Sequence, residues 1–169
     1  MQGFATTLER MELEEQARRY LEFVTAASKQ MAALLDELGL AVRIEGGRYE
    51  PALEEADTLE LVKAAAERVD GASGSGRGST VHVDVGAAEQ SLAALASCAL
   101  RHGGLKRVEL EAAGSEVRIS PVTEQAAPVV LARELKDLGA AVAGKAFEAL
   151  GGSLALERGT LTISLPAPG

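Results

Sequence analysis

The chain has 169 residues, 47% of them hydrophobic, and a formal net charge of -8 at pH 7. This length suits one compact domain with a short extension, and the acidic balance argues against a nucleic-acid partner, which requires clustered Lys and Arg. A single cysteine, Cys98, excludes an internal disulfide, and no apolar run is long enough for a membrane span or a secretory signal. We therefore expect a cytoplasmic protein that does not bind membranes.

The N-terminal part of the chain predicts a long helix with one apolar seam. Its apolar residues recur in steps of four and three, the heptad pattern of helices that pair with other helices. A helix of roughly 25 residues is about 37 Å long at 1.5 Å per residue, which exceeds what a small domain covers. We expect a homodimer, and a helix packed on its own domain is the alternative. The seam consists of Leu13, Ala17, Tyr20, Val24, Ala27, Met31, Leu34 and Leu38.

Glycines are expected to end this helix. Gly39, Gly46 and Gly47 disfavour helical backbone. The sequence therefore predicts a helical dimerisation segment over residues 1–47 and a globular domain over residues 48–169.

The globular domain opens with a helix signal and a glycine-rich stretch. The residues Asp57-Thr58-Leu59-Glu60 match the pattern of a capping box and predict a helix over about 59–69. Residues 71–79, GASGSGRGS, are expected to be a flexible loop. They lack the Lys-Ser/Thr ending of a phosphate-binding P-loop, so no phosphate site is expected there.

The rest of the chain predicts strands and helices in alternation. In chain order these are a strand at 80–85, a helix at 87–101, strands at 106–113 and 115–120 joined at Ala113-Gly114, a helix at 129–150, and a hairpin about Arg158-Gly159. This order places the helices on one face of a mixed sheet. The predicted fold class is α+β, a two-layer α/β sandwich.

This order of elements, with several sequence segments in it, resembles the C-terminal part of sensor histidine kinases. Residues 3–51, which end in RIEGGRYEP, are similar to the second helix of their dimerisation hairpin and the linker after it. The segments ADTLELVKAAAERV, SLAALASCALRHGG and AGKAFEALGGSLALERGTLTISLP are similar to the helices and closing strands of their ATPase domain. The resemblance implies a histidine-kinase-like ATPase domain of the Bergerat type behind a dimerisation helix.

The resemblance also implies a nucleotide site, and the sequence departs from it. In the family an Asn of the second helix holds the magnesium that bridges the ATP phosphates. Here Cys98 has that position and Ala94 lies one turn earlier, and a thiol is a poor ligand for so hard a cation. The family's adenine-binding Asp corresponds to Thr123, and two glycines of its motif correspond to Gln125 and Ala127.

The next glycine-rich motif of the family falls on residues 135–140. Only Gly139 is kept, and Asp137 lies where phosphates would approach. Too few residues separate Pro128 from Gly139 for an ATP lid. His102 matches a family position beside the phosphates, and stabilisation of its protonated form at a helix C-terminus is the alternative explanation for it.

The sequence also lacks a residue at the family's phosphoacceptor position and a cluster of metal-ligating residues. Family members carry a phosphoacceptor His before the GFA segment, which begins here at Gly3. His82 is expected to be an ordinary sheet residue, and Cys98 a buried helix residue rather than a reactive thiol. No Cys/His cluster has metal-ligand spacing, so no metal site is expected.

The sequence thus predicts a non-catalytic, pseudokinase signalling module of the two-component type, without ATP or magnesium as cofactors. It would act as a homodimer and through contacts with a response regulator or a sensor kinase. One alternative is a divergent histidine kinase or phosphotransferase, or a piece of one, that retains ATP-dependent phosphoryl transfer. A second alternative is an anti-sigma-like switch protein, although such proteins normally lack a long N-terminal helix and keep their nucleotide residues.

Overall fold

The computed structural model describes residues 15–167, and the seam residue Leu13 lies outside them. The chain divides into two compact units, with the boundary between Gly39 and Leu40. Among the described residues, no helix combines the length and the apolar character needed to cross a bilayer.

Helix α2 spans Glu15–Glu45, so the expectation that Gly39 breaks the helix was wrong. A single interior glycine costs only about 1 kcal/mol relative to alanine, which the surrounding helix tolerates. The helix ends instead at a Schellman motif: Gly47 adopts φ 62°, its N–H donates to the Ile44 carbonyl, and the Arg48 N–H donates to the Arg43 carbonyl.

The last turns of α2 belong to the second unit and have their own small core. Leu40 is 1% exposed and packs, with Ala41 and Ile44, against a cluster formed by Ala87, Val142 and Ala146. Glu45 forms an ion pair with Lys145. These contacts fix the end of α2 to the globular domain.

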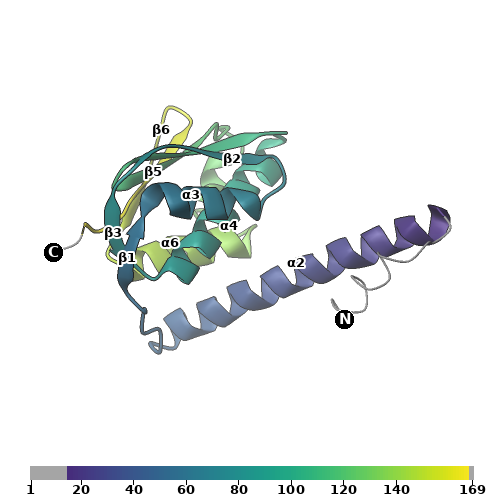
Figure 1. Ribbon diagram of the computed structural model, residues 1–169, viewed down its shortest axis with the longest axis horizontal. Coiled ribbons are helices and arrows are strands. Elements are labelled where there is room, and N and C mark those ends of the chain that lie inside the picture. Colours follow the sequence, from purple (N-terminus) through teal and green to yellow (C-terminus); the bar gives the residue numbers. More distant parts are fainter. Residues whose placement is uncertain (1–14, 168–169) are drawn as a thin grey trace. The chain divides into compact units, whose positions relative to one another are not determined.

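The globular domain contains a five-stranded sheet in the order β2-β4-β5-β7-β6. Its strands are β2 (Ala72–Gly78), β4 (Val108–Gly114), β5 (Glu116–Ser120), β6 (Ser153–Glu157) and β7 (Thr160–Ser164). Strands β2 and β4 are parallel, and the other neighbours are antiparallel. Helices α3 (Thr58–Glu67), α4 (Val85–Gly103) and α6 (Leu138–Ala149) lie against one face of this sheet (Figure 1). The predicted two-layer α+β sandwich is confirmed.

Strand β2 corrects the expectation of a flexible loop over residues 71–79. Its glycines permit close packing that a side chain would prevent. A Cβ on Gly76, where φ is 111°, would lie 2.2 Å from the Ala112 carbonyl oxygen of β4. A Cβ on Gly74 would lie 3.0 Å from the backbone of Lys63 in α3. The composition that resembles a linker is therefore what lets helix α3 and strand β4 approach this strand.

A second sheet has two strands, one before α3 in the sequence and one after β2. Strand β1 (Glu54–Asp57), which the sequence pattern did not predict, pairs antiparallel with β3 (Thr80–Val83), the strand expected at 80–85. Asp57 then caps α3 by accepting the Leu59 N–H at 2.8 Å. The predicted helix start at this residue is confirmed.

The single helix expected at 129–150 is two helices, α5 (Ala127–Val130) and α6. Ala132 has a positive φ of 52°, outside the helical region, and Asp137 starts α6 as its N-cap. The helix-favouring residues across the break, LARELK over 131–136, concealed it. The hairpin of β6 and β7 is confirmed, with Arg158 at φ 49° and Gly159 at φ 78° in its turn.

Candidate functional site: the Asp137 cluster

The end of helix α4 and the start of α6 bring four polar side chains together. Asp84 caps α4 at its N-terminus through the Ala87 N–H at 3.0 Å, and Gly104 ends the helix in the left-handed region. Alanines make up much of the buried surface of both helices, and such small side chains permit close packing. We call the resulting group of Cys98, Arg101, His102 and Asp137 the Asp137 cluster.

Asp137 is the acceptor at the centre of the cluster. Its Oδ1 accepts the Ala140 N–H at 3.1 Å, which caps α6. Its Oδ2 accepts a hydrogen bond from Nη2 of Arg101 at 2.7 Å and lies 3.2 Å from Nε2 of His102. The residue is only 8% exposed. A buried carboxylate is tolerated here because a cation, an imidazole and the positive end of the helix dipole all surround it.

Cys98 lies on the same face of α4 as His102, four residues away. Its side chain is fully buried, as expected of a core helix residue. Burial, followed by the charge of Asp137 and a hydrogen bond to it, raises the pKa of the thiol to about 12, while Arg101 acts in the opposite direction. The thiol is therefore neutral near pH 7 and unsuited to nucleophilic chemistry.

The structure also places three metal-ligating atoms together in this cluster. One ligand atom each from Cys98, His102 and Asp137 lies within 4.8 Å of the other two. The sequence pattern alone predicted no metal-binding cluster, because Asp137 is distant along the chain from the other two residues. The signals that could have found it were the spacing of Cys98 and His102 and the N-cap character of Asp137.

The remaining predicted site residues lie in a turn, at the start of a helix or within buried helix positions. Thr123 accepts the Ala126 N–H on its Oγ1 at 3.3 Å, and its carbonyl accepts the N–H groups of Ala126 and Ala127. Its hydroxyl thus serves the turn before α5. Ala127 begins α5, and Gln125 is exposed beside it. Ala94 and Gly139 are buried in α4 and α6.

Apolar side chains occupy the segment that follows Pro121. Val129 and Val130 are 2% and 1% exposed and belong to the main core, and Leu131 packs partly against it. A pocket of about 310 Å³ borders this segment, between residues 130–133, helix α6 and the start of β6. None of the residues that line it belongs to the Asp137 cluster.

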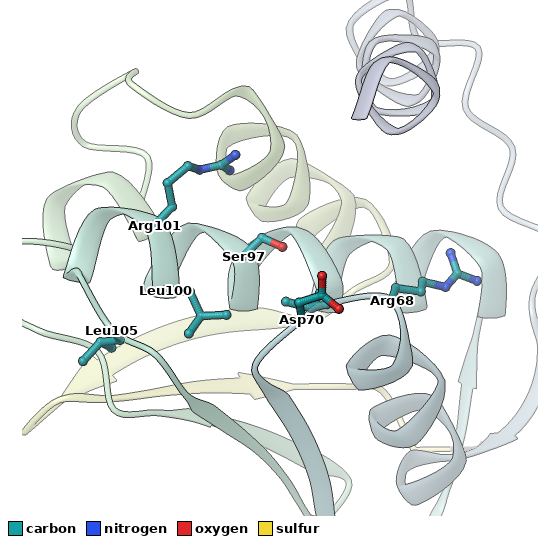
Figure 2. A pocket seen from close by; sticks show the side chains of 7 residues that line it. Arg68, Asp70, Ser97, Leu100, Arg101 and Leu105 are labelled. Carbon is teal, nitrogen blue, oxygen red and sulfur yellow. The ribbon is translucent and has the colours of Figure 1, made fainter. Parts of the chain in front are cut away.

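Figure 2 shows side chains that line a second pocket, beside α4. It measures about 320 Å³ and is bordered by residues 68–70 and by α4. Both of its arginines are engaged: Arg68 pairs with Glu89 at 2.5 Å, and Arg101 extends away from Leu100 to reach Asp137. The positive charge at its border is thus already compensated.

Solved structures of histidine kinases are similar to this chain. The ATP-binding domain of PrrB from Mycobacterium tuberculosis matches with a TM-score of 0.56 at 23% identity, over 70% of this chain and 99% of that one. Histidine kinase AdeS from Acinetobacter baumannii matches with a TM-score of 0.63 at 15% identity, over 99% and 92%. Full-length ShkA in complex with AMPPNP matches with a TM-score of 0.62 at 21% identity, over 97% and 42%.

No protein-family model and no curated protein matches the sequence, so the similarity is one of fold. The five-stranded sheet with helices on one face is consistent with the fold of these neighbours. The globular domain therefore has the Bergerat-type α/β sandwich fold of the ATP-binding domains of sensor histidine kinases.

Proposed function

We propose that this protein is a non-catalytic signalling module related to two-component sensor kinases, in which the chain's own side chains occupy the nucleotide region. The observation that carries the proposal is the position of the Asp137 carboxylate. It lies at the N-terminus of α6 and contacts Arg101 and His102. By the family resemblance, this is where nucleotide phosphates approach.

The carboxylate acts as an internal substitute for a phosphate. It has the same sign of charge and uses the donors that favour an anion at a helix N-terminus. A nucleotide would have to displace it from Arg101 and the Ala140 N–H, or place a second anion beside a buried one. Both routes cost free energy, because like charges repel strongly where water is excluded.

The other two parts of a nucleotide site also lack suitable groups. Cys98 offers a neutral thiol at the magnesium position, whereas magnesium requires oxygen ligands. The Thr123 hydroxyl accepts the Ala126 N–H, so its acceptor capacity is partly used within the turn. These features support the loss of ATP and magnesium binding.

Signalling without catalysis then depends on protein contacts, for which helix α2 offers a surface. Eight large apolar side chains form a stripe along it, each 48% to 73% exposed: Tyr20, Phe23, Val24, Met31, Leu34, Leu35, Leu38 and Val42. Ala17 and Ala27 of the predicted seam are exposed as well. Burying each large aliphatic side chain contributes about 1.5–3 kcal/mol. We propose that this stripe forms a homodimer and that the module binds a response regulator or a sensor kinase.

Calorimetric titration with ATP and magnesium tests the proposal. We expect no saturable heat for the unmodified chain, and no transfer of radiolabel from ATP. Micromolar binding, or a labelled chain, would contradict the proposal and favour a divergent kinase or phosphotransferase. The Asp137→Gly variant is the matched comparison, because it removes the carboxylate and introduces the glycine of the family motif. It should bind ATP more tightly than the unmodified chain does.

A further inference from the structure

We infer that Cys98, His102 and Asp137 form a binding site for a zinc-class transition-metal ion with one open coordination position. The inference goes beyond the proposed function, since the proposed exclusion of nucleotide by Asp137 concerns the metal-free chain. It rests on the donor set, the distances and the way in which the three side chains are held.

The donor set selects the class of metal. A thiolate, an imidazole and a carboxylate are the ligands that Zn²⁺ and Co²⁺ combine in proteins. Mg²⁺ and Ca²⁺ require oxygen ligands and are disfavoured by sulfur. Three protein ligands leave the fourth tetrahedral position to water, which is the arrangement of open zinc sites.

The distances are close to those of a formed site. Zinc–ligand bonds of about 2.0–2.3 Å in tetrahedral geometry place neighbouring ligand atoms roughly 3.3–3.6 Å apart. Nε2 of His102 and Oδ2 of Asp137 are already 3.2 Å apart, and all three ligand atoms lie within 4.8 Å. The distances to the Cys98 sulfur need to shorten by at most roughly 1.5 Å, which a side-chain rotation can supply.

Two contacts orient the Asp137 carboxylate and leave it able to bind a metal ion. The Ala140 N–H holds Oδ1, so Oδ2 faces α4. Arg101 donates to Oδ2 from a side chain that is 58% exposed, so its guanidinium can remain as an outer partner or move into solvent. On binding, the Cys98 S–H bond breaks, its proton passes to solvent and a sulfur–metal bond forms. The two ligand charges then balance the divalent ion.

The ligands also come from two different elements. Cys98 and His102 lie one turn apart on α4, and Asp137 is the N-cap of α6. A bound ion would therefore connect the two helices directly. Because metal binds only the folded arrangement, it should raise the stability of the domain.

The first test uses chain freed of metal by a chelator and titrated with Co²⁺ alone, then with Zn²⁺ alone in competition with a chromophoric chelator. We expect one ion per chain, a thiolate-to-cobalt charge-transfer band, visible bands of four-coordinate intensity, and a higher melting temperature with Zn²⁺. Absence of the charge-transfer band, or of any saturable Zn²⁺ binding, would overturn the inference.

Variants identify the ligands. Cys98→Ser should abolish the charge-transfer band, and His102→Gln and Asp137→Asn should each weaken Zn²⁺ binding at least tenfold. Asn retains the ability to cap α6, and melting of the metal-free variants shows whether they fold. His82→Gln, on β3, is the matched control and should bind as the unmodified chain does. Unchanged Zn²⁺ affinity in both His102→Gln and Asp137→Asn would contradict the site. ATP binding is measured in a separate titration of the metal-free chain. A negative result for the metal site therefore does not contradict the proposed loss of nucleotide binding, and the reverse also holds.

Discussion

Nη2 of Arg101 donates a 2.7 Å hydrogen bond to Oδ2 of Asp137, which joins the last turn of α4 to the N-cap of α6. The carboxylate therefore has two separable roles, a cap through Oδ1 and an ion-pair partner through Oδ2. Each role predicts a different response to substitution.

Asp137→Ala should lower the free energy of unfolding of the metal-free protein by about 1–3 kcal/mol, since it removes a cap and leaves buried donors without a partner. Asp137→Asn should cost less, because Asn still caps the helix and exposure of Arg101 weakens the ion pair. Asp57→Asn, at the cap of α3, is the control and should be nearly neutral. Urea denaturation measures all three. Equal losses in both Asp137 variants would show that the cap contributes nothing.

Restoring the family residues should recover only part of nucleotide binding. Cys98→Asn and Thr123→Asp reinstate the magnesium ligand and the adenine acceptor, each worth roughly 0.5–3 kcal/mol, but leave the Asp137 carboxylate in place. We expect weak ATP binding from this double variant and a measurable gain when Asp137→Gly is added. Calorimetry checks the order. Stronger binding by the double variant than by the triple variant would show that Asp137 does not compete with phosphate.

The apolar stripe of α2 predicts that Val24→Glu combined with Met31→Glu converts a dimer into a monomer, because buried unpaired carboxylates are strongly unfavourable. Light scattering at matched concentrations gives the mass. The control is Arg18→Gln with Lys29→Gln, which changes the net charge by the same amount at exposed positions outside the stripe and should leave the dimer intact. An unmodified chain that is monomeric at high micromolar concentration would refute the dimer.

Ser91 predicts a stabilising substitution. Its hydroxyl is buried in α4, and within the described structure it has no hydrogen-bond partner. Ser91→Ala removes a desolvated polar group and should raise the free energy of unfolding by about 1 kcal/mol. Ser97→Ala, a half-buried serine on the same helix, should change it little. Chemical denaturation compares the two variants. Destabilisation by Ser91→Ala would mean that the hydroxyl has a partner in solution.

Tyr49 predicts an alkaline limit to stability. Burial, then the charge of Asp84 and a hydrogen bond to it, raises the pKa of its phenol to about 12, against a smaller opposing effect of Arg43. The unfolded chain loses this proton near pH 10, so it binds fewer protons than the folded state between about pH 10 and 12. Stability should therefore fall as the pH rises through that window. Urea denaturation at several pH values should show a smaller fall in Tyr49→Phe.

Tyr20 supplies the control, since the chain has two tyrosines and Tyr20 is 63% exposed on α2. In Tyr20→Phe, the absorbance change of tyrosinate formation belongs to Tyr49 alone. It should appear near pH 12 in the folded protein. A transition near pH 10 in that variant would contradict the proposed environment of Tyr49.

The layers of the fold could be predicted because their signals are local. Alternating residues such as Val117 and Ile119 in β5 indicated a sheet with one buried face, and Asp57 indicated where α3 begins. Strand β2 could not be predicted in this way. Gly74 and Gly76 are explained by the approach of Lys63 and Ala112, which are distant in the chain, whereas the local composition is typical of a loop.

The site was predictable residue by residue but not as an arrangement. The departures at Cys98 and Thr123 were visible in the sequence, and Asp137 was visible as an acidic residue in an unusual place. That Asp137 reaches Arg101 and His102 depends on how α4 packs against α6. The break before α6 was hidden as well, because the helix-favouring residues of 131–136 continue across it and the positive φ of Ala132 leaves no local signal.

Strand β2 also determines where the chain tolerates engineering. A laboratory that takes residues 71–79 for a spacer would choose them for an affinity tag, a cleavage site or a circular-permutation break. Any such insertion would remove the edge strand from β4 and push its added side chains into the backbones of Ala112 and Lys63. The most linker-like segment of the described chain is thus among the least suitable places to cut it.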